Sequence, residues 1–162
     1  MMKFLPLKKF SGYTLLEIVV SLFILIILFS ATQAAYREFI LKKDLDNAKG
    51  QVMSDLRLAQ EYATAGRLTD SCLGLNGYEF VSSSSNQNYR IRSNCGSGSS
   101  DVKTVEMSDI SNGISINSQS VIFKVLGGGT NISADSSVQF VLTQRTTNNT
   151  RSVIVTSGGE IK

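Results

Sequence analysis

The feature that most constrains this chain is a run of nineteen consecutive residues without a charge, Ile18 to Tyr36, close to its beginning. An α-helix of that length spans about 28 Å, which is close to the hydrocarbon thickness of a bilayer. Lys3, Lys8 and Lys9 precede the run, whereas the residues after it carry charges of both signs. Because positively charged flanks stay in the cytoplasm, the pattern predicts one membrane-spanning helix with a cytoplasmic N-terminus and all later residues outside.

A cleaved secretory signal peptide is the main alternative, since it also combines a basic start with an apolar core. However, its only small-residue cleavage site, near Thr32 and Ala34, is a poor match, and helical character continues beyond it. Apolar residues then recur at spacings of three and four, which is typical of an amphipathic helix. They are Leu41, Leu45, Ala48, Val52, Leu56, Ala59 and Ala63, with Lys42, Lys43, Asp46, Lys49, Asp55 and Arg57 between them. One helix of about fifty residues, ended by Gly66, is therefore expected.

From residue 70 onward the pattern is that of short strands, rich in β-branched and aromatic residues and separated by Gly, Ser and Asn clusters. The predicted strands are 77–81, 88–93, 101–107, 114–116, 121–125, 138–144 and 152–156. An antiparallel sheet that covers the amphipathic helix gives an α+β fold. The runs "SSSSNQN" and "NCGSGSSD" and the triplet Gly127 to Gly129 are expected to be loops and a turn.

Cys72 and Cys95 are the only cysteines, and they follow the membrane segment in a polar region. This placement predicts a disulfide outside the cytoplasm. Two separate buried thiols are the alternative, because free cysteine behaves as a small apolar residue.

The residue inventory argues against an enzyme. The chain has no histidine, so it lacks the commonest general base, and two cysteines alone cannot complete a zinc site. No catalytic residue, metal or cofactor is expected. The net charge of +3 comes from the three leading lysines, so a nucleic-acid partner is not expected either. Two weaker candidates remain. One is a calcium site formed by Asp101, Glu106 and Asp109, and the other is a basic, aromatic patch for single-stranded nucleic acid formed by Tyr78, Tyr89, Arg90 and Arg92.

The stretch "SGYTLLEIVV", residues 11 to 20, places a single acid at the entrance of the apolar run. Thr14 and Glu17 have the spacing of a capping box, which explains the acid without any function. A charge within a membrane span costs about 2.5 to 3.5 kcal/mol near the centre and less near an edge, so such an acid also indicates a partner.

These residues resemble a known family. Lys8, Lys9, Gly12, Tyr13, Thr14, Leu15, Leu16 and Glu17, followed by the apolar run, are similar to the class III signal of type IV pilins and type II secretion pseudopilins. The resemblance implies that prepilin peptidase cleaves after Gly12 and methylates the new amine of Tyr13. It also implies a role for Glu17 in subunit register during assembly, and partners in other pilin subunits, the inner-membrane assembly platform and the lipid bilayer.

On this interpretation, residues 1–12 are a leader peptide, 13–36 a transmembrane and assembly helix, 37–66 an amphipathic helix, and 67–162 a periplasmic or extracellular β-sheet domain. Many major pilins carry a proline in the apolar helix, and its absence here favours a minor pilin or pseudopilin. "SVIFKVLGGGTN" and the C-terminal residues resemble the GspH and FimT group of minor pseudopilins. The alternative function is a membrane-anchored binding module, such as a minor pilin that recognises DNA or a secreted substrate.

Overall fold

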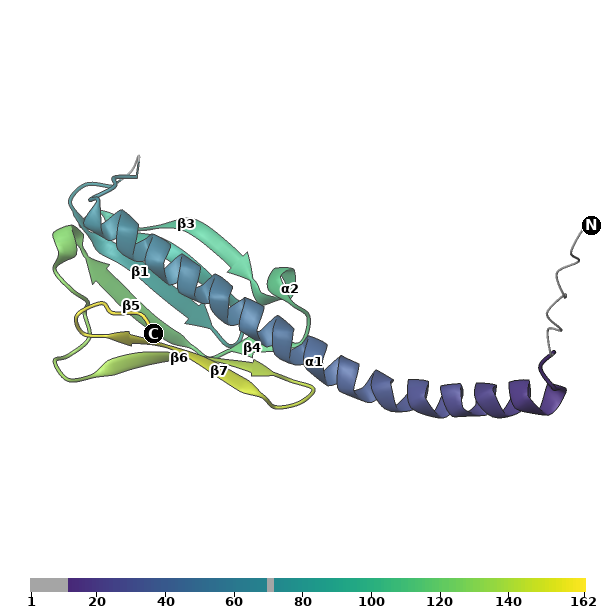
Figure 1. Cartoon of the computed structure of the whole chain (residues 1–162). Helices are drawn as coiled ribbons and strands as arrows, with labels where there is room; N and C mark the ends of the chain where they lie inside the picture. The colour runs from purple at the N-terminus through teal and green to yellow at the C-terminus, as the bar shows by residue number, and fades with distance from the viewer. Residues whose placement is uncertain (1–11, 70–71) are drawn as a thin grey trace, which may run out of the picture. The chain divides into compact units, whose positions relative to one another are not determined.

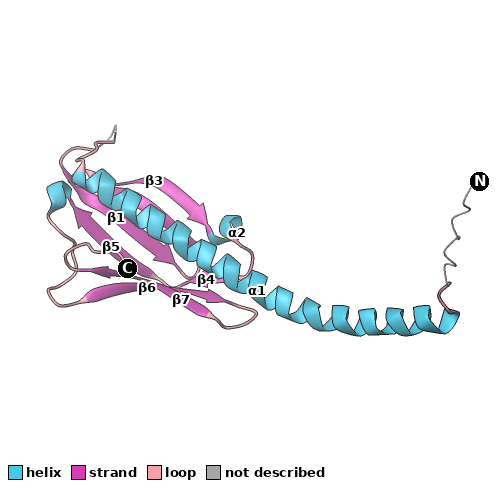
Figure 2. Ribbon diagram, in the orientation of Figure 1, coloured by secondary structure: helices cyan, strands magenta, loops and turns pink. Residues whose placement is uncertain are grey.

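The computed structural model describes residues 12–69 and 72–162. Apart from Gly12, the expected leader peptide lies outside the described residues. A fifty-residue helix, α1 (Leu15–Thr64), comes first and is followed by strands, as Figures 1 and 2 show. The chain divides into two compact units, one running to Phe39 and the other covering Ile40–Lys162. The division falls within α1, so the second half of this helix belongs with the strands.

The end of α1 has the expected glycine. Gly66 adopts a left-handed conformation (φ 58°), and its N–H donates to the carbonyl of Ala63. The N–H of Arg67 donates to the carbonyl of Tyr62, which completes a Schellman motif. The Arg67 guanidinium lies 4.7 Å from the centre of the Tyr62 ring and covers the last turn. The prediction that one helix continues until Gly66 is confirmed.

All seven predicted strands are present, but they form two antiparallel sheets where the sequence predicts one. The first sheet has the order β3-β2-β1-β5 and the second the order β4-β6-β7. The strands are β1 (Leu75–Ser83), β2 (Asn88–Cys95), β3 (Gly98–Glu106), β4 (Ile114–Ile116), β5 (Gln119–Lys124), β6 (Ser137–Gln144) and β7 (Thr150–Thr156). A short helix, α2 (Met107–Ile110), joins β3 to β4, and a 3-10 turn, η1 (Val125–Gly127), follows β5.

The core lies between the second half of α1 and the inner faces of both sheets (Figure 1). The helix contributes Leu45, Ala48, Val52, Leu56, Ala59 and Ala63, all completely buried. Phe80 of β1 connects the two sheets, since its ring stacks on Tyr89 of β2 and meets Phe140 of β6 edge to face. The prediction of an α+β fold with an amphipathic helix packed on antiparallel strands is therefore confirmed at this level.

The two predicted loops are shorter than expected. Ser82 and Ser83 belong to β1, where the buried Ser82 hydroxyl donates to the carbonyl of Asn117. Gly98 to Asp101 begin β3, paired with the end of β2. Serine is accommodated at the ends of these strands because strand pairing satisfies its backbone groups and the Ser82 hydroxyl has a partner of its own. Strand propensity alone does not predict this extension. The glycine triplet forms a turn after β5, as predicted, with φ 75° at both Gly127 and Gly129.

Candidate functional site

The first half of α1 is apolar on all sides and uncovered within the chain. Every described side chain from Ile18 to Phe29 is exposed, including Phe23, Leu25 and Ile26 at 60% or more. Near the N-terminus, the helix is long and apolar enough to cross a membrane. A helix that is apolar all round must be buried somewhere, and no other described part of the chain covers it.

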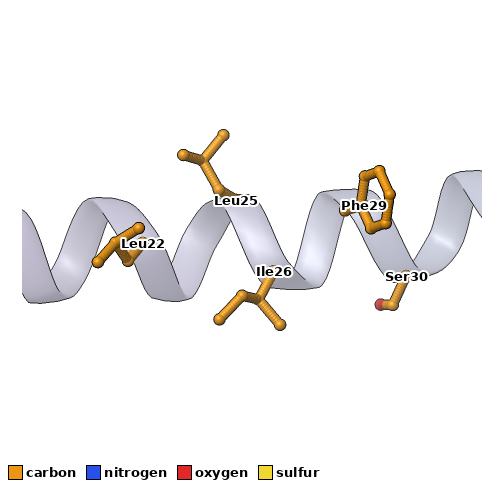
Figure 3. Close-up of a pocket in the computed structure, with 5 residues that line it drawn as sticks. All are labelled: Leu22, Leu25, Ile26, Phe29 and Ser30. Carbon is orange, nitrogen blue, oxygen red and sulfur yellow. The ribbon is translucent and has the colours of Figure 1, made fainter.

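Figure 3 shows one face of this segment, formed by Leu22, Leu25, Ile26, Phe29 and Ser30. Their spacing of three and four residues places them side by side along the helix. The space beside them measures about 390 Å³ and is open. Such a face offers apolar contacts to lipid chains or to another helix, and its one polar side chain, Ser30, bonds to the helix itself.

The serine hydroxyls in this segment are satisfied by the helix itself. The Ser21 hydroxyl donates to the carbonyl of Ile18 at 2.9 Å, and that of Ser30 donates to the carbonyl of Ile27 at 2.8 Å. In hydrocarbon every polar group needs an internal partner because no water is available. The two serines are therefore compatible with a lipid environment.

Glu17 lies in the first turn of α1, next to the capping residue. The backbone N–H of Glu17 donates to the Thr14 hydroxyl at 3.3 Å and to the Thr14 carbonyl at 3.1 Å. Thr14 thus acts as the N-cap that the sequence predicts. The Glu17 carboxylate is exposed, and no described cation lies within ion-pair distance of it. Gly12 and Tyr13 precede the helix and are exposed as well.

The structure joins Cys72 and Cys95 in a disulfide, with their Cα atoms 5.5 Å apart. This is the pair that the sequence predicts. The bond connects the segment after α1 to the end of β2, where Cys95 is largely buried. The loop that the disulfide closes, residues 72–95, contains β1 and β2.

Sequence reasoning missed a buried charge. Asp55 of α1, expected on the polar side of the helix, is 3% exposed. Its carboxylate accepts hydrogen bonds from the Tyr89 hydroxyl (2.8 Å), the Lys103 ammonium (2.7 Å) and the Gln51 amide (3.3 Å). Burial, followed by the hydrogen bond to Asp55 and its negative charge, raises the pKa of Tyr89. Asp55 stands three residues after Val52 and four before Ala59, so the helical spacing was a signal for its burial, whereas nothing in the helix sequence indicates its partners on β2 and β3.

The candidate nucleic-acid patch is not assembled. Tyr78 and Tyr89 are completely buried, so they cannot stack on bases. Arg90 and Arg92 lie on the outer face of β2, and both pair with Asp101, at 3.3 and 2.6 Å. Burial opposes ionisation of Asp101, but hydrogen bonds from the two arginines outweigh it and lower the pKa of this carboxyl. Part of the positive charge of the strand is therefore neutralised within the sheet.

The candidate calcium ligands do not gather either. Asp101 is held by the two arginines, and Glu106 accepts a hydrogen bond from the Asn88 amide at 3.1 Å. Asp109 lies on α2. Within residues 12–69 and 72–162, no three side chains of the His, Cys, Asp and Glu types come close enough to share a metal ion.

Comparisons with models of protein families, with curated proteins and with solved structures found no match for this chain.

Proposed function

We propose that the chain is a structural subunit, of the minor pilin or pseudopilin kind, of a type IV pilus or type II secretion pseudopilus. On this proposal, prepilin peptidase cleaves after Gly12 and methylates the amine of Tyr13. The first half of α1 then serves as a membrane anchor before assembly and as the polymerisation element afterwards. The residues after Tyr36 lie in the periplasm or outside the cell.

One observation carries the proposal: the exposed apolar half of α1 begins with a single acid, four residues after Tyr13. A capping box alone explains an acid in a first helical turn, but it does not explain why Gly12, an aromatic residue and an apolar run of membrane length stand together in this order. Cleavage at Gly12 would create a positive amine close to the same membrane depth as Glu17 of a neighbouring subunit. In a medium of low dielectric constant these two charges attract more strongly than in water, and each left alone would lose hydration without compensation.

The contact between Glu17 of one subunit and the amine of the next is head-to-tail. A heterologous contact that does not close on itself produces a helical filament. Within such a filament, faces such as that of Leu22, Leu25 and Phe29 pack against the same segment of neighbouring subunits. Little apolar surface would then meet water in either the membrane or the filament.

The proposal is tested by replacing Glu17 with Gln in the full chain and measuring the subunit in membrane and filament fractions. We expect membrane insertion to remain and incorporation into filaments to fall at least about tenfold, since a charge pair at an effective dielectric constant of 20 contributes up to about 4 kcal/mol. Glu61→Gln is the matched control, because Glu61 is an exposed acid of the same helix within the unit that contains the sheets. Normal incorporation of the Glu17 variant would refute the role of this residue.

A further inference from the structure

A cavity of about 200 Å³ lies where three connections of the unit that contains the sheets meet. Gln87 comes from the turn between β1 and β2, and Arg145 directly follows β6. The third wall is the segment from α2 to the start of β4. Backbone hydrogen bonds fix these segments to one another. The N–H of Met107 donates to the backbone carbonyl of Gln87 at 2.9 Å, and the N–H of Arg145 donates to the backbone carbonyl of Gly113 at 2.8 Å. Segments distant in sequence thus build one hollow.

One unsatisfied polar atom lies at this cavity, and the others belong to residues close to its walls in sequence. In the described part of the chain, the buried side-chain polar atoms that lack a hydrogen-bond partner all belong to four residues, Gln87, Asn88, Gln144 and Thr147. Of these four residues only Gln87 lines the cavity; Asn88 follows it in sequence, and Gln144 and Thr147 stand one residue before and two residues after Arg145. Buried polar groups are nearly always paired, so the unpaired Gln87 oxygen at the cavity indicates that a polar molecule completes it.

Gln144 places a second unpaired amide behind the cavity wall. Its side chain is 1% exposed, and neither its amide oxygen nor its amide nitrogen has a partner among the described residues. It lies against Gly113, a residue that lines the cavity: a Cβ atom at Gly113 would stand 3.2 Å from the Gln144 Oε1 atom. Because Gly113 has φ 86° and no side chain, the buried amide and the cavity wall can be neighbours.

The charge at the cavity is positive. Arg145 lines it, is exposed, and forms no ion pair with any described residue. Ser108, Ser111 and Asn112 add hydroxyl and amide groups to the wall. An arginine recognises a carboxylate with paired N–H donors, whereas amide oxygens accept from an N–H group. A single water molecule needs only about 10 to 15 Å³, so the cavity has room for a larger occupant.

We propose that this cavity binds a carboxylate with an N–H group one carbon away, presented either by a free amino acid or by the C-terminal residue of a polypeptide. Arg145 pairs with the carboxylate. The unpaired amide oxygen of Gln87 accepts a hydrogen bond from the neighbouring N–H group, and the hydroxyls of Ser108 and Ser111 donate to the second carboxylate oxygen. This site is independent of the membrane segment and of the assembly role of Glu17.

The experiment titrates three small probes into the full chain in detergent micelles and measures binding by calorimetry. Glycine represents the free amino acid, N-acetylglycine represents a chain end, and N-acetylglycinamide lacks the carboxylate. We expect one of the first two to bind at millimolar concentration and the third not to bind. Tighter binding of glycine assigns the free amino acid, and tighter binding of N-acetylglycine assigns the chain end.

Two variants separate a binding site from a solvent-filled hollow. Arg145→Gln should weaken binding about tenfold or more, whereas Arg57→Gln, an exposed arginine of α1, should leave it unchanged. Gln144→Met should raise the melting temperature without probe, since it deletes the unpaired amide, and should leave probe binding in place, because Gln144 does not line the cavity. Absence of binding by glycine and N-acetylglycine, equal binding of N-acetylglycinamide, or unchanged affinity in Arg145→Gln would overturn the proposal.

Discussion

At the scale of single residues, the carboxylate of Asp55 connects α1 to β2 through Tyr89 and to β3 through Lys103. A buried charge is tolerable only when hydrogen bonds and an opposite charge replace its lost hydration. The three donors around Asp55 meet that requirement. The cluster therefore favours one register of the helix on the first sheet, because a shifted helix would leave the carboxylate without donors.

Replacing Lys103 with Met should lower the free energy of unfolding by about 1 to 3 kcal/mol, since it leaves the Asp55 carboxylate without its counter-charge. This is less than a fully buried pair would lose, because the Lys103 side chain is 37% exposed. Urea unfolding in detergent micelles measures the change. Adding Asp55→Asn should recover part of the loss. Arg151→Met, which breaks the exposed pair with Asp46, should cost less than about 1 kcal/mol; an equal loss in both single variants would contradict the account.

Tyr89 predicts a specific response to high pH. Its pKa is raised in the folded chain by burial first and then by Asp55, so the hydroxyl stays protonated where the unfolded chain ionises. The stabilisation is complete below the ordinary tyrosine pKa of about 10. Above that pH, the free energy of unfolding falls by about 1.4 kcal/mol per pH unit. Unfolding of the wild type and of Tyr89→Phe between pH 8 and about 11 measures this slope. The variant should be less stable at neutral pH but should show a shallower decline, and identical slopes would exclude this role.

At the scale of elements, α1 shows what hydrophobic patterning can predict. An uncharged run followed by apolar residues at spacings of three and four predicts one helix whose two halves lie in different environments. Gly66 predicts where that helix ends. Six of the seven predicted positions, from Leu45 to Ala63, are buried as expected, whereas Leu41 is only half-buried. The strands are equally well marked, because alternating β-branched and aromatic residues between Gly and Ser clusters specify local structure.

Pairing between elements was not predictable in the same way. The division of seven strands into two sheets depends on contacts across the core, such as Phe80 with Phe140, and these leave no periodic signal in the sequence. The same holds for the partners of Asp55, since Lys103 lies forty-eight residues later in the chain. The cavity beside Arg145 was also missed, since its walls come together only after the two sheets have formed.

The disulfide is the covalent link between the segment after α1 and the first sheet. A separation of 23 residues closes a loop that, on the chain-entropy model, contributes roughly 3 kcal/mol by restricting the unfolded chain. Replacing both Cys72 and Cys95 with Ser should therefore lower the free energy of unfolding by about 2 to 4 kcal/mol. Urea unfolding with and without a reductant measures it. The reductant should affect only the wild type, and equal stability of reduced and oxidised protein would contradict the prediction.

At the scale of the whole molecule, the chain combines a segment that suits lipid with a unit of ordinary protein character. The residues up to Phe39 contain the exposed apolar helix, and those from Ile40 onward contain the core. As a filament subunit, the chain would polymerise through the first part and present the second to its surroundings. The proposed ligand cavity belongs to the second part, so binding and assembly can be altered separately.

The central claim is that a cut between Gly12 and Tyr13 creates the positive chain end that Glu17 of a neighbour neutralises. The most direct measurement is the intact mass of the protein purified from its host, with and without prepilin peptidase. The account predicts a mass that corresponds to residues 13–162 plus one methyl group when the peptidase is present, and the full-length mass when it is absent. A chain that still begins at Met1 in the presence of the peptidase would contradict the account and leave a membrane-anchored module in its place.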